Sequence, residues 1–220
     1  MTTPSPEGSI ILVDKPLEWT SFDVVNKLRY ALKIKKIGHA GTLDPLASGL
    51  LILCTGKMTK QIDKYQAQEK EYTGKLILGK TTPSFDLETE VDSETDISHL
   101  KEDDIYPVTE KFTGTIHQIP PAYSAIKVKG KRAYESARKG ETIQLKSREV
   151  EISVFEITGV NLPEISFRVV CSKGTYIRSL VRDFGEALGV GAYLSELRRT
   201  RIGDFTVDQA KTIEEIVTKI

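Results

Sequence analysis

The sequence predicts an α+β fold: a mixed, largely antiparallel sheet with flanking helices and an active-site cleft. Apolar runs typical of strands outnumber helical patterns, and the two do not alternate regularly as they do in doubly wound proteins. The 220 residues, 39% of them hydrophobic, suffice for one sizeable core. We therefore expect a single domain over residues 1–220, with an acidic surface excursion at about 80–104 and a basic flap at about 120–147.

The first half of the chain mixes strand and helix signals. SIILV has the apolar character of a buried strand, and Thr20 or Ser21 can cap a helix whose Val24 and Leu28 share one face. A glycine-rich turn region opens at Gly38. We expect strands at residues 9–13, 50–55 and 72–78, and helices after residue 21 and at 59–67.

The second half begins with the acidic excursion, which lacks any sustained apolar period. Alternation returns at Ile165, Phe167 and Val169, which predicts a strand with one buried face. We expect strands at residues 113–119, 165–171 and 193–199, and helices at 100–112, within the flap, and at 177–188.

The formal net charge is zero, but the charges are segregated along the chain. Between Asp86 and Asp104 there are nine acidic residues and one lysine, so this segment carries −8 and the remainder +8. The basic residues gather in four clusters: Lys33, Lys35 and Lys36; Lys57, Lys60 and Lys64; Lys127, Lys129, Lys131, Arg132, Arg138 and Lys139; and Arg198, Arg199 and Arg201. One such cluster is often only a solvated surface, but four together favour a polyanionic partner.

Several classes of protein are disfavoured. No run approaches the roughly 18 apolar residues of a membrane helix, and MTTPSPEGS lacks the regions of a secretory signal, so we expect a cytoplasmic protein. A GxxxxGK[ST] phosphate loop is absent, and no histidine accompanies a GxSxG motif, which argues against nucleotide-triphosphate enzymes and hydrolase triads. Cys54 and Cys171 lie in apolar runs without metal-ligand spacing, which predicts buried free thiols and no metal site.

The densest signal is GHAGTLDPLASGLL, residues 38–51, in which glycines and a proline punctuate an apolar segment. Asp44 precedes the proline, which restricts its backbone to extended conformations. Leu43, Leu46 and Leu50 could shield its carboxylate from water. An isolated Asp-Pro pair is usually only a turn, so the complete loop, rather than the pair, makes Asp44 a candidate catalytic residue.

This loop resembles the signature loop of TruB-like pseudouridine synthases, whose aspartate is essential for isomerising uridine in tRNA, and Asp44 occupies that aspartate's place. The resemblance continues, in order, through DKPLEWTS, KEYTGKLILG, IPPAYSAIKVKGKRAYESARKG, CSKGTYIRSLVRDFGEALG and LSELRRTRIGDF, and so covers nearly the whole chain. It implies the pseudouridine synthase fold. It also implies an enzyme that detaches uracil from its ribose, rotates it and rejoins it through carbon, without a cofactor.

The resemblance also assigns roles to other residues. Tyr72 is similar to the tyrosine that stacks on the flipped base, a contact worth on the order of 1–3 kcal/mol. Tyr176 and Arg178 match residues that line the pocket; on a strand end or loop, their spacing of two would point both to one side, and an arginine beside Asp44 would keep that carboxylate ionised. The remaining matches are His39 near the displaced nucleotide, Leu197 as an apolar closure, Lys15 as a substrate contact or a brace of the loop, and Asp86 in support of the arginine.

The implied partner is tRNA, bound at its T-loop and elbow and modified at the uridine conventionally numbered 55. We expect a monomer with no obligatory protein partner and no membrane contact. The basic flap corresponds to a family segment that pins the RNA loop. Many relatives continue into a small C-terminal RNA-binding domain, and because the sequence ends at Ile220 we expect the catalytic domain alone. Pro83 and the pair Glu88-Thr89 depart from the family pattern around Asp86.

Three points stay open at the level of sequence. Asp44 could attack the sugar, attack the uracil ring or remove a proton from the sugar. A non-catalytic RNA-binding or RNA-folding protein could use the same surface, and a synthase of this fold could work inside a guide-RNA complex. The intact loop and pocket set favour the tRNA isomerase over both alternatives.

Overall fold

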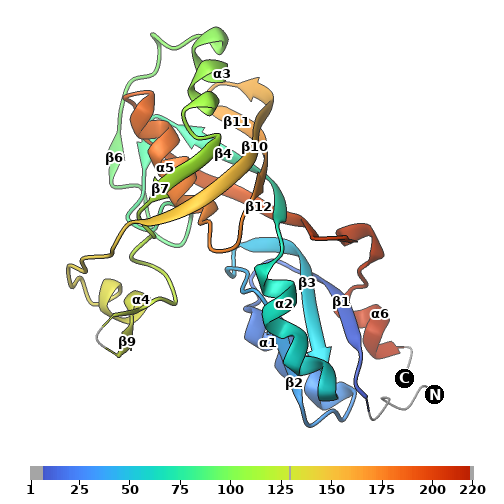
Figure 1. Cartoon of the computed structure of the whole chain (residues 1–220). Helices are drawn as coiled ribbons and strands as arrows, with labels where there is room; N and C mark the ends of the chain where they lie inside the picture. The colour runs from blue at the N-terminus through green and yellow to red at the C-terminus, as the bar shows by residue number, and fades with distance from the viewer. Residues whose placement is uncertain (1–6, 129, 219–220) are drawn as a thin grey trace. The chain divides into compact units, whose positions relative to one another are not determined.

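The computed structural model describes residues 7–128 and 130–218 (Figure 1). The chain forms two compact units: a first unit of Met1–Thr73 with Glu196–Ile220, and a second unit of Gly74–Ser195. The boundaries fall inside two strands, β4 (Lys70–Leu78) and β12 (Ala192–Ile202). Each unit therefore contains a part of both strands.

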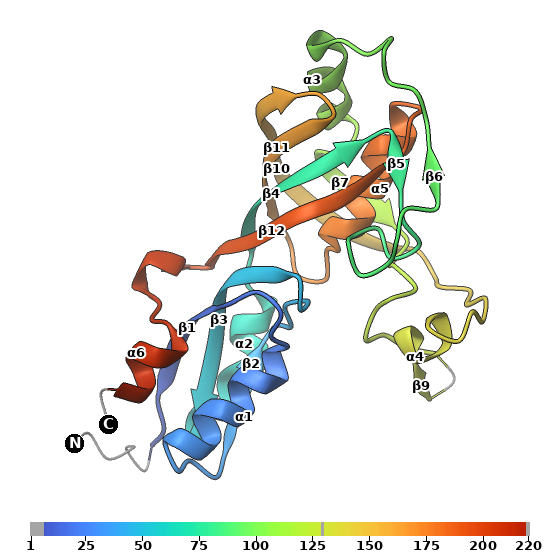
Figure 2. The ribbon, with the colours of Figure 1, turned by 180° about the vertical axis from the view of Figure 1, so that it is seen from behind.

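The first unit is built around the long strand β3 (Ala47–Thr55). This strand pairs antiparallel with β1 (Ile10–Lys15) and β2 (Ile37–Ala40), and parallel with β12. The other elements are α1 (Ser21–Ala31), the 3₁₀ helix η1 (Gly56–Gln61), α2 (Ile62–Ala67), β13 (Phe205–Thr206), the 3₁₀ helix η2 (Val207–Gln209) and α6 (Ile213–Thr218). Figure 2 shows α6 beside β1.

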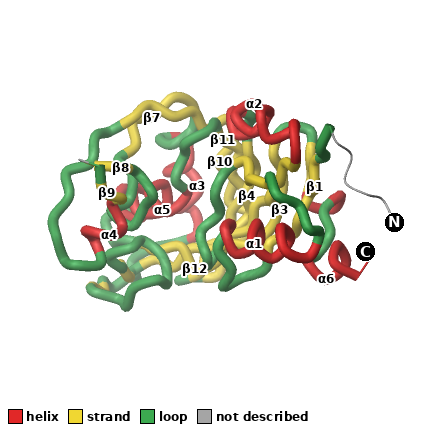
Figure 3. The backbone as a smooth tube through the Cα atoms, turned by 90° about the horizontal axis from the view of Figure 1, so that it is seen from below, coloured by secondary structure: helices red, strands yellow, loops and turns green. Residues whose placement is uncertain are grey.

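Both faces of β3 are buried, which explains its continuous apolar run LLILC. Leu51 and Leu53 belong to a core cluster with residues of α1 and α6. Leu50 and Ile52 belong to a second cluster with Tyr65 of α2. Figure 3 shows α1 and α2 on opposite sides of β3. Each such buried side chain contributes roughly 1.5–3 kcal/mol of transfer free energy, so the strand is a firm support for the loop that precedes it.

The second unit contains the antiparallel pair β10 (Arg148–Asn161) and β11 (Glu164–Cys171). Its sheet order is β12-β4-β11-β10-β7, where β7 is Gly114–Gln118. Its helices are α3 (Glu102–Glu110), α4 (Ala133–Ala137) and α5 (Ile177–Ala187). Two short pairs complete it: β5 (Lys80–Thr81) with β6 (Ser93–Glu94) in the excursion, and β8 (Lys127–Val128) with β9 (Lys131–Arg132) in the flap.

Helix α5 packs onto the β10–β11 pair through aromatic rings. The ring of Phe184 lies 5.4 Å from that of Phe155 and 6.4 Å from that of Phe112, which follows α3. Phe155 in turn meets Phe167 edge-on at 6.2 Å. These contacts anchor α5, whose first turn carries one of the candidate site residues.

The α+β architecture, the mixed sheet and most predicted elements are confirmed, with a few differences. Strand β2 lies in the glycine-rich region that we expected to be only a turn, and the 14-residue strand β10 was not anticipated. Helix α3 continues through Pro107. Cys54 and Cys171 are buried free thiols, as predicted. Among the described residues, no helix is long and apolar enough to cross a membrane.

Candidate active site

The loop of residues 41–46 joins β2 to β3 and holds Asp44 by its backbone. The hydroxyl of Ser21, at the start of α1, accepts a hydrogen bond from the Leu43 amide at 2.9 Å and donates to the Leu43 carbonyl at 3.2 Å. The Pro45 carbonyl accepts from the Glu18 amide at 2.9 Å. The backbone is therefore fixed on both sides of Asp44.

The surroundings of Asp44 are more open than the sequence suggested. Leu43 and Leu50 are buried, but Leu46 is 37% exposed, so the expectation that three leucines enclose the carboxylate is wrong for Leu46. Leu46 points outward because the loop turns into β3, where the Ala47 amide donates to the Asp44 carbonyl at 3.1 Å. Asp44 itself is half-buried. The backbone around Asp44 is thus held in place, while the residue keeps some exposed surface.

Lys15 lies under the loop with no exposed surface. Its ammonium donates to the carbonyls of Trp19 at 2.6 Å, Pro16 at 2.8 Å and Pro45 at 3.5 Å. Burial lowers its pKa to about 8, against the opposing attraction of the Asp44 carboxylate. Of the two roles considered from the sequence, substrate contact or brace, the geometry is that of a brace.

Arg199, in β12, is a site residue that the sequence analysis grouped only with a basic cluster. Its side chain is buried, and its guanidinium donates to the carbonyls of Leu50 at 2.8 Å, Gly41 at 3.2 Å and Thr42 at 3.5 Å. Gly49 of β3 allows the backbone of β12 to come close at Arg199. Its φ is +102°, and a Cβ there would lie 2.3 Å from the Arg199 carbonyl oxygen. Arg199 therefore ties the start of the loop that carries Asp44 to strand β3.

Three further candidates belong to the first unit. His39 in β2 is half-buried, and its pKa is lowered by burial and by the charge of Arg199, so the imidazole is neutral at physiological pH. Its Nδ1 atom is buried without a hydrogen-bond partner among the described residues. Leu197 in β12 is half-buried and pairs with Ala47, the first residue of β3. Tyr72 in β4 is buried, with 8% of its surface exposed.

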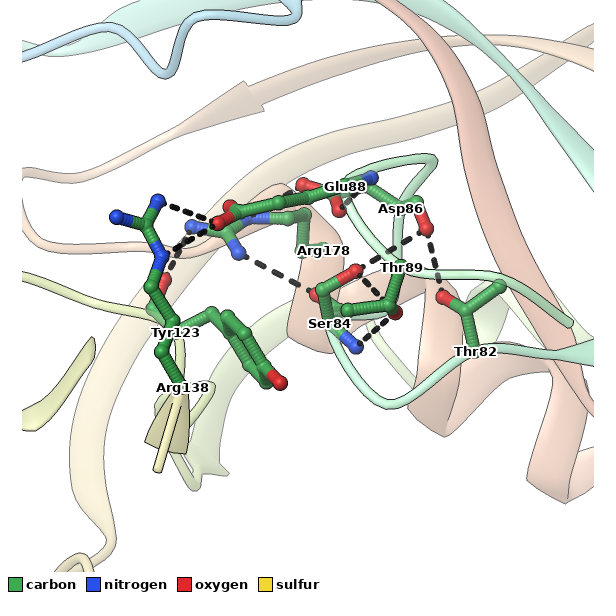
Figure 4. Close-up of polar contacts among 8 residues, drawn as sticks. All are labelled: Thr82, Ser84, Asp86, Glu88, Thr89, Tyr123, Arg138 and Arg178. Carbon is green, nitrogen blue, oxygen red and sulfur yellow. Dashed lines mark hydrogen bonds and ion pairs between the residues drawn. The ribbon is translucent and has the colours of Figure 1, made fainter. Parts of the chain in front are cut away.

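The second unit holds Arg178 and Asp86 as a buried ion pair (Figure 4). Arg178 lies in the first turn of α5, and its Nε is 3.4 Å from Oδ2 of Asp86. Its guanidinium also donates to the carbonyls of Tyr123 at 2.9 Å and Ser84 at 3.3 Å. The amide of Glu88 donates to Oδ1 of Asp86 at 2.9 Å. Despite the departures noted around Asp86, the start of the excursion thus delivers this carboxylate to the arginine.

Tyr176 is the N-cap residue of α5 and has an extended backbone, so it lies at a loop end as expected, whereas Arg178 lies inside the first turn of the helix. The argument that a spacing of two on one extended segment points both side chains to one side therefore does not apply to this pair. The buried side chain of Gln118 holds the Tyr176 backbone: it accepts from the amide at 2.8 Å and donates to the carbonyl at 3.0 Å. The Arg148 guanidinium lies 4.6 Å from the centre of the Tyr176 ring. These contacts fix the position of the ring.

The basic clusters differ in how much of their charge is used inside the protein. In the last cluster Arg199 is buried, Arg201 pairs with Glu69 at 2.8 Å, and Arg198 makes a two-pronged pair with Asp14. That cluster therefore offers less free charge than the sequence suggested. In the flap Arg138 pairs with Glu88 at 2.6 Å, whereas Lys127, Lys131, Arg132 and Lys139 are exposed; Lys129 lies outside the described residues.

The candidate residues thus fall into two sets. Lys15, His39, Asp44, Tyr72 and Leu197 belong to the first unit, and Asp86, Tyr176 and Arg178 to the second. Within the described residues, no group of three or more histidine, cysteine or acidic side chains is arranged to hold a metal ion. What the geometry offers is a carboxylate on a braced loop, together with aromatic rings and a buried arginine.

Comparison with known proteins identifies relatives along the whole chain. Residues 29–177 match the model of the TruB family pseudouridylate synthase N-terminal domain, and residues 178–220 match that of the tRNA pseudouridylate synthase B C-terminal domain. The chain is 56% identical over 211 residues to tRNA pseudouridine synthase B of Flavobacterium johnsoniae, covering 93% of this chain and 92% of that protein. It is 57% identical over 215 residues to the protein of that name from Parabacteroides distasonis, covering 95% and 92%.

Solved structures show the same fold. A chain in the crystal structure of a Cbf5-Nop10-Gar1 complex superposes with a TM-score of 0.76 at 34% identity, over 97% of this chain and 54% of that one. A chain of an H/ACA RNP bound to a substrate RNA containing 2'-deoxyuridine gives 0.72 at 30% identity, over 97% and 53%. The present chain therefore spans about half the length of these two solved chains.

Proposed function

The chain belongs to the TruB family of pseudouridylate synthases, and on that premise we propose that it isomerises uridine to pseudouridine in the T-loop of tRNA. The structural observation that carries the proposal is the loop of residues 41–46, in which Asp44 is accessible while its neighbours are fixed by Ser21, Lys15 and Arg199. A group that attacks or deprotonates one atom of a flipped nucleotide must be held in position before the substrate arrives. The bracing of this loop meets that requirement.

Asp44 is the residue that we propose to act on the nucleotide. A carboxylate can attack the sugar, attack the uracil ring, or remove a proton from the sugar while the glycosidic bond to nitrogen is broken and a bond to carbon is made. All three routes need an ionised carboxylate that touches the substrate. None of them requires a metal or an organic cofactor.

Aromatic and cationic residues would hold the flipped base. Extracting a base from a folded RNA loop costs a few kcal/mol, and a stacking contact with Tyr72 would return on the order of 1–3 kcal/mol of it. Tyr176 and Arg178 are also proposed to contact the flipped nucleotide. Arg178 would be a poor free cation because Asp86 already neutralises it, and its fixed guanidinium suits a directional hydrogen bond better.

The remaining residues have supporting roles in this proposal. His39 is neutral and half-buried, so the exposed part of its ring could hydrogen-bond or stack with RNA in the space the uridine leaves. Leu197, which pairs with the first residue of β3, would close the pocket by apolar contact. Lys15 would brace the loop from below, as its three carbonyl contacts indicate.

The experiment that tests the proposal uses unmodified tRNA transcript in chelator-treated buffer. Wild-type protein should form one pseudouridine in the T-loop, mapped by chemical derivatisation and mass spectrometry. Asp44→Asn should form none while binding tRNA normally, and Asp63→Asn, which changes an exposed carboxylate of α2 in the same unit, should behave as wild type. If Asp44→Asn retained activity, Asp44 would lose its central role.

We further propose that the protein acts as a monomer in the cytoplasm, with tRNA as its partner. The high identity to relatives named tRNA pseudouridine synthase B supports this choice over a guide-RNA complex. A non-catalytic RNA-binding protein would give a different result in the same assay: wild type and Asp44→Asn would both bind tRNA, and neither would form pseudouridine.

A further inference from the structure

Two lysine clusters that are separate in the sequence meet at one end of the first unit. Lys33, Lys35 and Lys36 precede β2, whereas Lys57 and Lys60 lie in η1 after β3. The register of β2 and β3 pairs Ile37 with Thr55, and the Gly56 amide donates to the Lys36 carbonyl at 2.9 Å. The loop before β2 and the 3₁₀ turn after β3 therefore lie side by side at the tip of β3 (Figure 1).

The cations at this end are exposed and mostly uncompensated. The set, which we call the distal lysine face, consists of Lys33, Lys35, Lys36, Lys57 and Lys60, all of them exposed. Of the described acidic residues, Glu7 pairs with Lys57 at 2.6 Å, and Asp63 follows in α2. By contrast, Arg198 and Arg201 of β12 form ion pairs with acidic residues of the same unit.

This face lies far from Asp44. Asp44 precedes β3 and contacts its first residue, Ala47, while the distal lysine face begins after its last residue, Thr55. A nine-residue strand spans about 26 Å from first to last residue at roughly 3.3 Å per residue. The cluster therefore cannot contact the nucleotide on which Asp44 acts.

We propose that the distal lysine face binds the phosphodiester backbone of the tRNA outside the T-loop, along the helix that continues from the T stem. This proposal rests on the proposed function, because the distance from the distal lysine face to the bound RNA is counted from the uridine on which Asp44 acts. Exposed lysine ammonium groups suit phosphates, which are bound by charge, more than bases, which are read by stacking and directional hydrogen bonds. In a whole tRNA the T stem stacks on the acceptor stem, so backbone continues beyond the end of an isolated T-arm hairpin.

The test compares a face variant with a matched control. The face variant carries Lys35→Gln, Lys36→Gln and Lys60→Gln, which leave the Lys57–Glu7 pair intact; the control carries Lys101→Gln, Lys111→Gln and Lys211→Gln, also exposed. Both are assayed on whole tRNA transcript and on the isolated T-arm hairpin. Affinity is measured by fluorescence anisotropy at several salt concentrations, and urea unfolding checks that both variants are folded.

We expect the face variant to bind whole tRNA about tenfold more weakly than wild type, with a salt-dependence slope smaller by about two to three. Its affinity for the hairpin and its kcat on both RNAs should match those of the control. Equal loss on tRNA and hairpin, or a slope equal to that of the control, would overturn the proposal. Binding is measured independently of catalysis, so absence of pseudouridine with wild type would refute the proposed function instead.

Discussion

The two units hold their candidate residues by different means. In the first unit, two buried cations, Lys15 and Arg199, bind backbone carbonyls around Asp44. In the second unit, the buried Arg178 is paired with a carboxylate, Asp86, and its remaining donors go to two carbonyls. The first arrangement fixes the path of a loop and leaves the carboxylate of Asp44 accessible. The second fixes a cation by neutralising it. The comparison teaches that a buried cation can serve either to fix a loop, as Lys15 and Arg199 do, or to be fixed itself, as Arg178 is.

The ion pair of the second unit should show the largest effect on stability. Asp86→Asn would leave the Arg178 guanidinium buried without its carboxylate, which costs about 3–5 kcal/mol. Urea unfolding of the variant would measure this loss. The double variant Asp86→Asn with Arg178→Gln should recover part of it, because no unpaired charge is left inside. A loss below about 1 kcal/mol for Asp86→Asn would show that water reaches the pair.

Arg199 should affect rate more than binding. Arg199→Met removes two hydrogen bonds to the loop and one to Leu50 in β3, and a displacement of about 1 Å in a catalytic group can cost on the order of 100-fold in kcat. We expect that fall in kcat on tRNA with little change in KM, and a partial recovery in Arg199→Lys. Arg201→Met, two residues further along β12, is the matched control and should keep its kcat. An equal fall in both variants would assign the effect to β12 as a whole.

Lys15 should show its role in the pH dependence of stability. Its pKa in the folded protein, about 8, lies below the ordinary 10.5, so between these values the unfolded chain binds more protons. The free energy of unfolding of wild type should therefore rise with pH across that window, relative to Lys15→Met. At pH 7 the variant should lose about 1–3 kcal/mol, because three carbonyls lose their donor. Urea unfolding from pH 7 to 10.5 measures both effects; a constant difference would contradict the lowered pKa.

The pair between the flap and the excursion should matter least. Arg138 and Glu88 are 2.6 Å apart on the surface, where such pairs contribute about 0–1 kcal/mol. Arg138→Gln should therefore change the unfolding free energy by less than about 1 kcal/mol. A larger loss in thermal unfolding would mean that the flap is held to the excursion by more than this contact.

The fold was predictable where the residue pattern is strong and local. The alternation of Ile165, Phe167 and Val169 marked β11, and the capping signal at Thr20 marked α1, whose Asp23 completes a capping box. Strand β2 was missed because its sequence, IGHA, has too few apolar residues to show a period. It is held instead by pairing with β3, which no local pattern reveals.

The site was predictable as a set of residues but not as an arrangement. Asp44 and Lys15 stood out within their motifs, yet whether Lys15 contacts the substrate or the loop depends on burial. Arg199 was hidden because its neighbours Arg198 and Arg201 are also arginines. Strand alternation separates Arg199 from Arg198 but not from Arg201, which is two residues away, and only the structure shows that Arg199 is the buried one. For Tyr176, the predicted helix at 177–188 already placed Arg178 inside a helix, but the sequence did not reveal that Gln118 holds the Tyr176 backbone from β7.

The hydrogen bonds of Ser21 couple the loop that carries Asp44 to helix α1. Its hydroxyl meets both backbone groups of Leu43, so a side chain takes the place of a neighbouring strand. Leu43 is buried, and its amide can exchange with deuterated solvent only when this contact opens. Opening requires the first turn of α1 to shift, and α1 is secured by its capping box and by Val24 and Leu28 in the core. The amide of Leu43 should therefore exchange with deuterium about as slowly as the amides of α1, although Leu43 lies in a loop.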